Sequence, residues 1–239
     1  MRDPITPELR TRQASESWQD NHSGSCRSTL KSISEASTIA TSYPREPVLE
    51  WLSQHVPELR LKHILRVEQM AIALAHHHQV DVQRAGQAGL LHDLAKYFKP
   101  ERLLQMAREA GLEIDPVDEA NPHLLHAEVS AIVAKTELGI RDEAVLEAIR
   151  NHTLGRPGMS RLSCVVFLAD SLEPGRGNTP ELETLRQASW QDLYQGVWLT
   201  CEQTIHWLFE QQRLVHPRVI LTRNWAMPLA KQQMQAANS

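Results

Sequence analysis

Cysteine is scarce in this sequence, and its three cysteines, Cys26, Cys164 and Cys201, lie far apart. They form no Cys-x-x-Cys pair, so the sequence indicates neither a disulfide framework nor a structural zinc site. Long hydrophobic runs are also missing, because no apolar stretch approaches the roughly 20 residues that span a bilayer. The first residues lack the compact apolar core of a secretory signal. These absences predict a soluble, cytoplasmic protein without a membrane partner.

A strong excess of charge of either sign is absent too, since the formal net charge is −4 over 239 residues. Such a balance gives no overall attraction to nucleic acid, so we expect no nucleic-acid partner. Hydrophobic residues make up 41% of the chain, which is enough to bury a core. The residue that the chain does have in quantity is histidine, with 12 copies.

Residues 1–45 contain nine serines and five threonines, scattered charges and no sustained apolar period. This composition buries too little apolar surface to offset the entropy lost on ordering, so we predict a flexible extension. An organelle-targeting peptide is an alternative, although the five acidic residues of the segment argue against it. A gene start placed too far upstream is another. The folded domain is predicted to cover residues 46–239.

From residue 47 onward the apolar residues recur with a helical period. Ile64, Val67, Ala71 and Leu74 are three or four residues apart and mark one face of a helix. Prolines and a glycine separate the segments that follow, where helices usually end. Further helices are predicted over 82–97, 101–110, 123–137, 142–152, 160–172, 181–189, 191–212 and 217–235. Strand-like alternation is scarce, so the predicted fold is an all-α helical bundle.

Six residues of metal-binding type fall on or beside the apolar faces of these helices. They are His63, His92, Asp93, His126, His152 and Asp170. A single histidine on an apolar face is usually a core residue bonded to the backbone, and a lone aspartate at a helix end is often a cap. Burying all six without compensation would cost several kcal/mol each. Because imidazole and carboxylate both bind first-row metals, the set predicts two divalent metal ions.

The spacing of these residues supports one shared site. Apart from the adjacent pair His92-Asp93, they lie 18 to 33 residues apart, which places one group on each helix or helical hairpin. Neighbouring helical residues point about 100° apart, so His92 and Asp93 cannot chelate as a pair four residues apart would, but they can reach around a central site if their helix faces the bundle axis. Asp93 is predicted to bridge two ions through its two oxygens.

The order His…His-Asp…His…His…Asp resembles that of the HD superfamily of metal-dependent phosphohydrolases. The local segments are similar to those of the YqeK family, the symmetrical bis(5′-nucleosyl)-tetraphosphatases, over roughly residues 47–225. Those segments are LKHILRV (61–67), LLHDLAK (90–96), HLLHA (123–127), IRNHTLGRPGMS (149–160) and ADSLEPGR (169–176). The resemblance implies an HD-domain bundle that cleaves diadenosine tetraphosphate, a dinucleoside polyphosphate, into two ADP.

The resemblance carries the family's metal ligands onto the six residues named above. It implies iron, whereas the ligand types themselves also suit manganese or nickel. It further matches a nucleotide and phosphate pocket at Arg60, Lys96, Thr153, Arg156, Arg176 and His216. One departure is Ala127-Glu128, where the family often has Gly or Ala-Pro, and the added carboxylate bears on substrate contacts.

Catalysis is predicted to depend on Asp93, Lys96, His126 and His152. Two metal ions would activate a bridging water and hold the attacked phosphate. Lys96 would neutralise a phosphate oxygen, while Arg156 and Arg176 would bind the departing ADP as planar forks. A solvated lysine at a helix end, and exposed loop arginines, are the alternative interpretations of these three residues.

Two other functions are compatible with the sequence. The first is an HD phosphohydrolase acting on another nucleotide, because metals define the reaction type and pocket walls define the substrate. The second is a non-catalytic nucleotide-sensing HD module, which would predict a damaged ligand set, whereas all six residues are present. The oligomeric state is left open, a homodimer included, as is a partner-binding role for residues 1–45.

Overall fold

Helices make up the part of the chain that the computed structural model describes, residues 43–237, and no strand occurs within that range. The predicted all-α fold is therefore confirmed there. Residues 1–42, nearly all of the predicted extension, lie outside the described residues. In chain order the elements are α2 (Arg45–His55), α3 (Glu58–His77), α4 (Val82–Leu91), α5 (Pro100–Glu109), α6 (Pro116–Ala120), η2 (Pro122–Leu125), α7 (His126–Thr136), α8 (Glu143–Asn151), α9 (Arg161–Leu172), η3 (Pro174–Arg176), α10 (Pro180–Gln191), α11 (Leu193–Glu210) and α12 (Pro217–Ala237).

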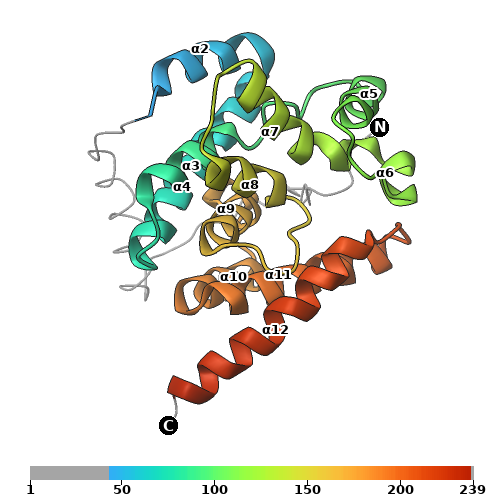
Figure 1. Cartoon of the computed structure of the whole chain (residues 1–239). Helices are drawn as coiled ribbons and strands as arrows, with labels where there is room; N and C mark the ends of the chain where they lie inside the picture. The colour runs from blue at the N-terminus through green and yellow to red at the C-terminus, as the bar shows by residue number, and fades with distance from the viewer. Residues whose placement is uncertain (1–42, 238–239) are drawn as a thin grey trace, which may run out of the picture.

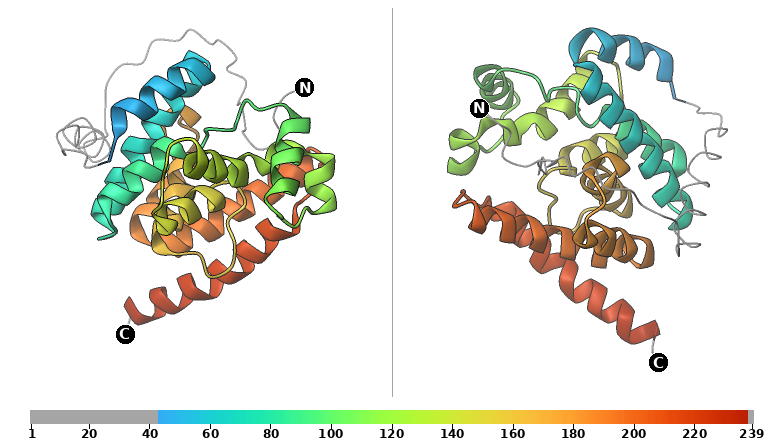
Figure 2. Two further views of the ribbon diagram at one scale, coloured as in Figure 1. Left: turned by 45° about the horizontal axis from the view of Figure 1, so that its top comes forward. Right: turned by 180° about the vertical axis from the view of Figure 1, so that it is seen from behind.

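Four helices, α3, α4, α8 and α9, pack against one another at the centre of the bundle (Figure 1). α2 covers one end of this group, and α7 joins it through α8 and α4. At the opposite end α10, α11 and α12 form a further layer, in which α12 packs along α11 (Figure 2). The four central helices are therefore covered at both ends.

α9 is apolar around its whole circumference, and all of its residues from 162 to 169 are buried. Such a helix is stable only when other helices cover every face, and α3, α4, α8, α10 and α11 do so here. Asp170 follows this apolar run directly and is thereby carried into the centre of the bundle. No helix within residues 43–237 has the length and apolar character needed to span a bilayer.

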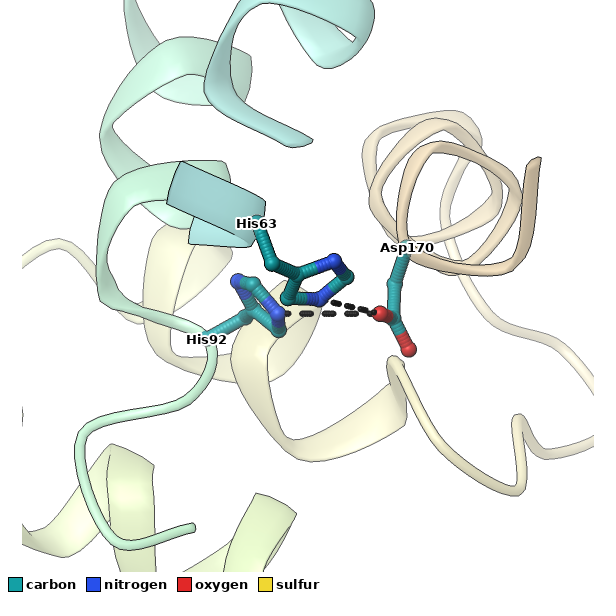
Figure 3. Close-up of side chains that lie close together, drawn as sticks. All are labelled: His63, His92 and Asp170. Atoms are coloured by element: carbon teal, nitrogen blue, oxygen red, sulfur yellow. Dashed lines mark ion pairs between the residues drawn. The ribbon is translucent and has the colours of Figure 1, made fainter. Parts of the chain in front are cut away.

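A glycine allows α3 and α4 to approach closely. A Cβ atom on Gly89 would lie 3.0 Å from Glu68 Cα and 3.3 Å from Ala71 Cβ, both on α3. Such distances are tighter than most real Cβ contacts, so any larger residue would have to push the α3 backbone away by a few tenths of an ångström. The close packing brings the end of α4, with His92, beside His63 on α3 (Figure 3).

The predicted helix over 82–97 is too long, because α4 ends at Leu91 and residues 92–97 form successive turns. The His92 ring donates from Nδ1 to the carbonyl oxygen of Gly89, which lies in the last turn of α4. The following backbone tightens to bonds between residues three apart, such as Lys96 N–H to Asp93 O at 3.1 Å. The His-Asp pair therefore lies in a turn after the helix rather than within it.

The predicted helix over 123–137 is likewise divided. A 3₁₀ turn, η2, precedes α7, and α7 begins only at His126. The short helix α6 was not predicted, because its five residues are too few to show an apolar period. The remaining predicted helices agree with α5 and with α8 to α12 to within a few residues at each end.

The Gly89 contact predicts the result of a substitution. Gly89→Val should lower the free energy of unfolding by about 1–3 kcal/mol, because its branched side chain overlaps the α3 backbone. Thermal unfolding of the metal-free protein would measure this loss. Gln87→Val on the partly exposed face of the same helix is the control and should change stability little. Equal effects of the two variants would contradict the close approach.

Candidate metal centre

All six predicted ligand residues converge at the centre of the bundle. His63 comes from α3, His92 and Asp93 from the turn after α4, and Asp170 from α9. His126 begins α7, and His152 follows directly after α8. The four histidines and Asp93 are at most 6% exposed, and the side chain of Asp170 is 19% exposed.

One half of the site consists of His63, His92 and Asp170 (Figure 3). The Oδ1 atom of Asp170 lies 3.1 Å from His63 Nε2 and 3.7 Å from His92 Nε2. Each residue thus directs one potential ligand atom at a common point between α3, α4 and α9. These atoms are close enough together to hold one ion.

The other half contains His126 and His152, whose Nε2 atoms lie 3.0 Å apart. Asp93 lies between the two halves. Its Oδ1 is 3.3 Å from His126 Nε2 and 3.8 Å from His152 Nε2, whereas its Oδ2 is 3.4 Å from His92 Nε2. The two oxygens of one carboxylate therefore face different halves of the site.

The ring orientation of three histidines is fixed by the backbone. Nδ1 of His92, His126 and His152 lies 2.7, 2.5 and 2.7 Å from the carbonyl oxygen of the residue three positions earlier. A carbonyl oxygen only accepts, so each Nδ1 must carry the hydrogen. In the neutral ring Nε2 then presents a lone pair toward the centre, as a metal ligand does.

The donor set of the site fits a cation. His63 Nε2 and His92 Nε2 are buried and make no hydrogen bond within the described residues, although carboxylate oxygens lie nearby. Two neutral rings at positions 126 and 152 would oppose their lone pairs at 3.0 Å. Buried polar atoms without partners are costly, and a cation supplies the missing partner to all of these atoms.

At three residues of the site, burial and charge favour the protonation states that metal binding requires. At His92 burial lowers the pKa, but Asp93 and Asp170 outweigh it and raise that pKa. Burial raises the pKa of Asp93, but His92, His126 and Arg60 outweigh it and hold that pKa well below its usual value. Burial lowers the pKa of His152 well below its ordinary value and also lowers that of His126. The carboxylate is therefore ionised while these two imidazoles are neutral.

Comparison with known proteins identifies the family. The HD domain family matches residues 60–175. The chain is 35% identical over 181 residues to a Bacillus subtilis protein named bis(5′-nucleosyl)-tetraphosphatase, symmetrical, covering 76% of this chain and 96% of that one. The chain belongs to this HD-domain family. A Staphylococcus aureus protein of the same name is 32% identical over 174 residues, with 72% of this chain and 89% of that protein covered.

A solved structure of an HD protein has a similar fold. It is the crystal structure of a predicted HD superfamily hydrolase involved in NAD metabolism from Clostridium acetobutylicum. The TM-score is 0.74 at 33% sequence identity, and the match covers 78% of this chain and 98% of that one. As a member of the HD family, the chain binds divalent metal ions, and the clustered His and Asp residues are the groups that could hold them.

Two of the predicted phosphate-binding arginines of this HD protein lie at the aspartates of the centre. Arg60 donates to Asp93 Oδ2 at 3.0 Å, and Arg176 donates to Asp170 Oδ1 at 2.6 Å. Arg156 does not reach the centre: its half-exposed side chain pairs with Glu147 on α8. The structure therefore brings Arg60 and Arg176 to the site but holds Arg156 on the surface.

The other predicted substrate residues lie on one side of the centre. Lys96 is 8% exposed, and its positive charge joins burial in lowering the pKa of His126. Thr153 Oγ1 is 3.3 Å from His126 Nε2. His216 is buried and pairs with Asp118 at 3.3 Å. Lys96 and Thr153 therefore face the His126 half of the site.

A small pocket of about 30 Å³ extends from Thr153 to His216. Its walls combine apolar side chains with a few polar ones, as small-molecule pockets do. The lining residues are Asn121, Leu124, Thr153, Leu154, Thr204, Leu208, Arg213, Leu214, His216 and Val219. Because Thr153 also touches His126, the pocket opens beside the metal-binding residues.

Two polar residues at the site were missed by the sequence analysis. Glu173 is 1% exposed and lies 3.0 Å from His63 Nδ1, and Asp118 pairs with His216. Burial raises the pKa of Glu173, but His63, Arg66 and the Gly175 N–H lower it to about 2. The only signal for Glu173 was its place in the segment ADSLEPGR, three residues after Asp170.

Metal binding should stabilise the fold measurably. Adding Mn²⁺ to metal-free protein at 100 times its Kd should raise the free energy of unfolding by about 2.7 kcal/mol. Asp93→Ala should abolish this rise, because it removes the carboxylate shared by both halves. Glu113→Ala, on an exposed acidic residue, is the control and should keep it. A full shift in Asp93→Ala would rule out the shared role of Asp93.

Proposed function

We propose that this chain catalyses the metal-dependent symmetrical hydrolysis of diadenosine tetraphosphate, and of related dinucleoside polyphosphates, to nucleoside diphosphates. Diadenosine tetraphosphate would give two ADP. The observation that carries this proposal is the buried convergence of four Nε2 atoms and two aspartates in a chain that covers 96% of its Bacillus relative. A cytoplasmic location and a homodimer stay predictions.

The proposal includes two metal ions, one in each half of the site. His63, His92 and Asp170 would hold one ion, His126 and His152 the other, and Asp93 would contribute an oxygen to both. Iron is the proposed metal, with manganese or nickel as alternatives, since mixed imidazole and carboxylate ligands suit all three. When bound, the ions would lower the pKa of a bound water and neutralise phosphoryl oxygens.

The cationic side chains are proposed to hold the polyphosphate. Lys96 lies near His126, where its ammonium group would bind a non-bridging phosphate oxygen of the attacked phosphate. Arg60 and Arg176 are each oriented by one aspartate, through one or two of the five N–H donors of a guanidinium. Their other donors would bind phosphates as planar forks. Ordering these groups before the substrate arrives lowers the entropy that binding must overcome.

The small pocket between Thr153 and His216 is proposed to receive part of one nucleoside of the substrate. A nucleoside there would place its phosphates beside Thr153 and the His126 half of the centre. His216 accepts a hydrogen bond from the Arg218 N–H at Nδ1, so its Nε2 donates toward Asp118 and the ring is fixed. Arg156 would join the departing diphosphate only if its ion pair with Glu147 opened.

A substrate panel with chromatography of the products tests this function. Diadenosine tetraphosphate should yield ADP alone, and in ¹⁸O-labelled water one of the two ADP molecules should carry the label. ATP together with AMP would contradict symmetrical cleavage. NAD belongs in the panel, because the similar Clostridium protein is described as involved in NAD metabolism. Turnover of another nucleotide alone would favour the alternative substrate, and no turnover of any would favour a sensing role.

The arginines provide a second test. Arg176→Ala should retain bound metal but lower kcat/KM at least about tenfold, because a charged hydrogen bond contributes about 1.5–3 kcal/mol. Arg150→Ala is a matched control, since within residues 43–237 Arg150 pairs with Glu143 and Glu147 on α8. Steady-state kinetics with metal analysis would separate the two variants. Unchanged kinetics in Arg176→Ala would exclude this arginine from phosphate binding.

A further inference from the structure

His63 differs from the other three histidines of the centre in what holds its Nδ1 atom. Nδ1 of His92, His126 and His152 faces a backbone carbonyl, whereas Nδ1 of His63 lies 3.0 Å from the Glu173 Oε1 carboxylate oxygen. Glu173 stands 110 residues further along the chain, at the end of α9. The orientation of His63 therefore depends on a side chain from another element.

Glu173 is itself held by several donors. Arg66, one turn after His63 on α3, donates from Nε to Oε2 at 2.5 Å and from its terminal nitrogen to Oε1 at 3.3 Å. The Gly175 N–H donates to Oε2 at 2.5 Å. Glu173 is 1% exposed, so these bonds compensate a buried negative charge. Its carboxylate has little freedom to leave His63.

Gly175 leaves the space that Arg66 occupies. A Cβ atom built on Gly175 would overlap the Arg66 guanidinium group. α3 thus supplies both the histidine and the arginine that bracket Glu173, and the turn after α9 supplies the glycine beside them. Glu173 is therefore bonded on one side to two side chains of α3 and on the other to the backbone of η3.

We propose that Glu173 is a positioning residue of the metal centre, which fixes the Nδ1–H form of His63 and directs its Nε2 lone pair at the ion. A carboxylate bonded to a ligating imidazole raises the basicity of that ligand more than a neutral carbonyl does. The half formed by His63, His92 and Asp170 therefore binds its ion more tightly than it would without Glu173. Arg66 serves the carboxylate, not the ion.

A merely structural role for Glu173 makes different predictions. In that case Glu173 would only cap η3, through the Gly175 N–H, and fasten it to α3 through Arg66. Loss of Arg66 or of Glu173 would then have the same consequence, a less stable loop. The two roles separate when metal binding and ring tautomer are measured apart from stability.

The first experiment titrates the full-length metal-free protein with Mn²⁺ and counts free ions by electron paramagnetic resonance. His63→Ala and His152→Ala identify which binding step belongs to each half. Glu173→Ala should weaken the His63 step by about 10–100-fold and leave the other step nearly unchanged. Glu173→Gln keeps an acceptor but loses the charge, so its loss should be smaller. Arg66→Ala should lower the melting temperature but retain most of the Mn²⁺ affinity.

The second readout is the tautomer of His63, from the ¹⁵N shifts of histidine-labelled protein without metal. Wild type should carry a proton on Nδ1, and Glu173→Ala should show rings both with and without that proton. Wild-type Mn²⁺ affinity in Glu173→Ala, or an Arg66→Ala variant that loses the His63 step just as fully, would overturn the proposal. If Glu173→Ala does not fold, the Glu173→Gln comparison decides, and an unshifted His63 step in that variant would overturn it too.

This inference rests on the metal centre of the proposed function, but the two fail separately. Wild-type protein that binds Mn²⁺ and cleaves no dinucleotide would refute the proposed function and leave the role of Glu173 intact. Conversely, turnover of diadenosine tetraphosphate with unaltered Mn²⁺ steps in both Glu173 variants would refute only the role of Glu173.

Discussion

The helices bring buried polar groups together that repel one another, and the metal centre depends on how this repulsion is compensated. His126 and His152 oppose their Nε2 atoms at 3.0 Å, while both Nδ1 atoms are occupied by backbone carbonyls. Two ionised aspartates stand within 4 Å of imidazole nitrogens in the same space. One shared proton would relieve a single contact and leave the others. Cations relieve all of them, because every facing atom is then a ligand.

Two features of the fold bring the ligand residues close together. α9 is apolar on all faces, so it must be surrounded, and its burial carries Asp170 inward. Gly89 removes the side chain that would keep α4 away from α3. Neither feature performs chemistry, yet both determine how near the ligand atoms come. The energetics of packing and the geometry of the site are therefore set by the same contacts.

Much of this could be predicted from the sequence, because buried polar residues are visible against an apolar period. Six such residues from five separate segments of the chain were expected to share a partner, and they do lie together. The end of α4 could not be predicted in this way, since a ring bonded to its own backbone leaves no trace in hydropathy.

Side chains at loop positions were harder to place. Glu173 precedes a proline at a helix end, where a carboxylate commonly caps a helix. Its contact with His63 spans 110 residues, so no local pattern indicates it. Arg156 was predicted at the phosphates, but spacing does not encode the direction of a loop side chain, and Glu147 binds it instead.

The rings that bond to their own backbone have a consequence for assembly. His92, His126 and His152 each acquire their orientation within a four-residue segment, so three ligands are ready as soon as their local turns form. The orientation of His63 alone depends on the packing of the end of α9 against α3. Local turns therefore orient three of the ligand rings, and the contact between α9 and α3 orients the fourth. Loosening of the contact between α9 and α3 would thus disturb one ligand ring and leave the local orientation of the other three intact.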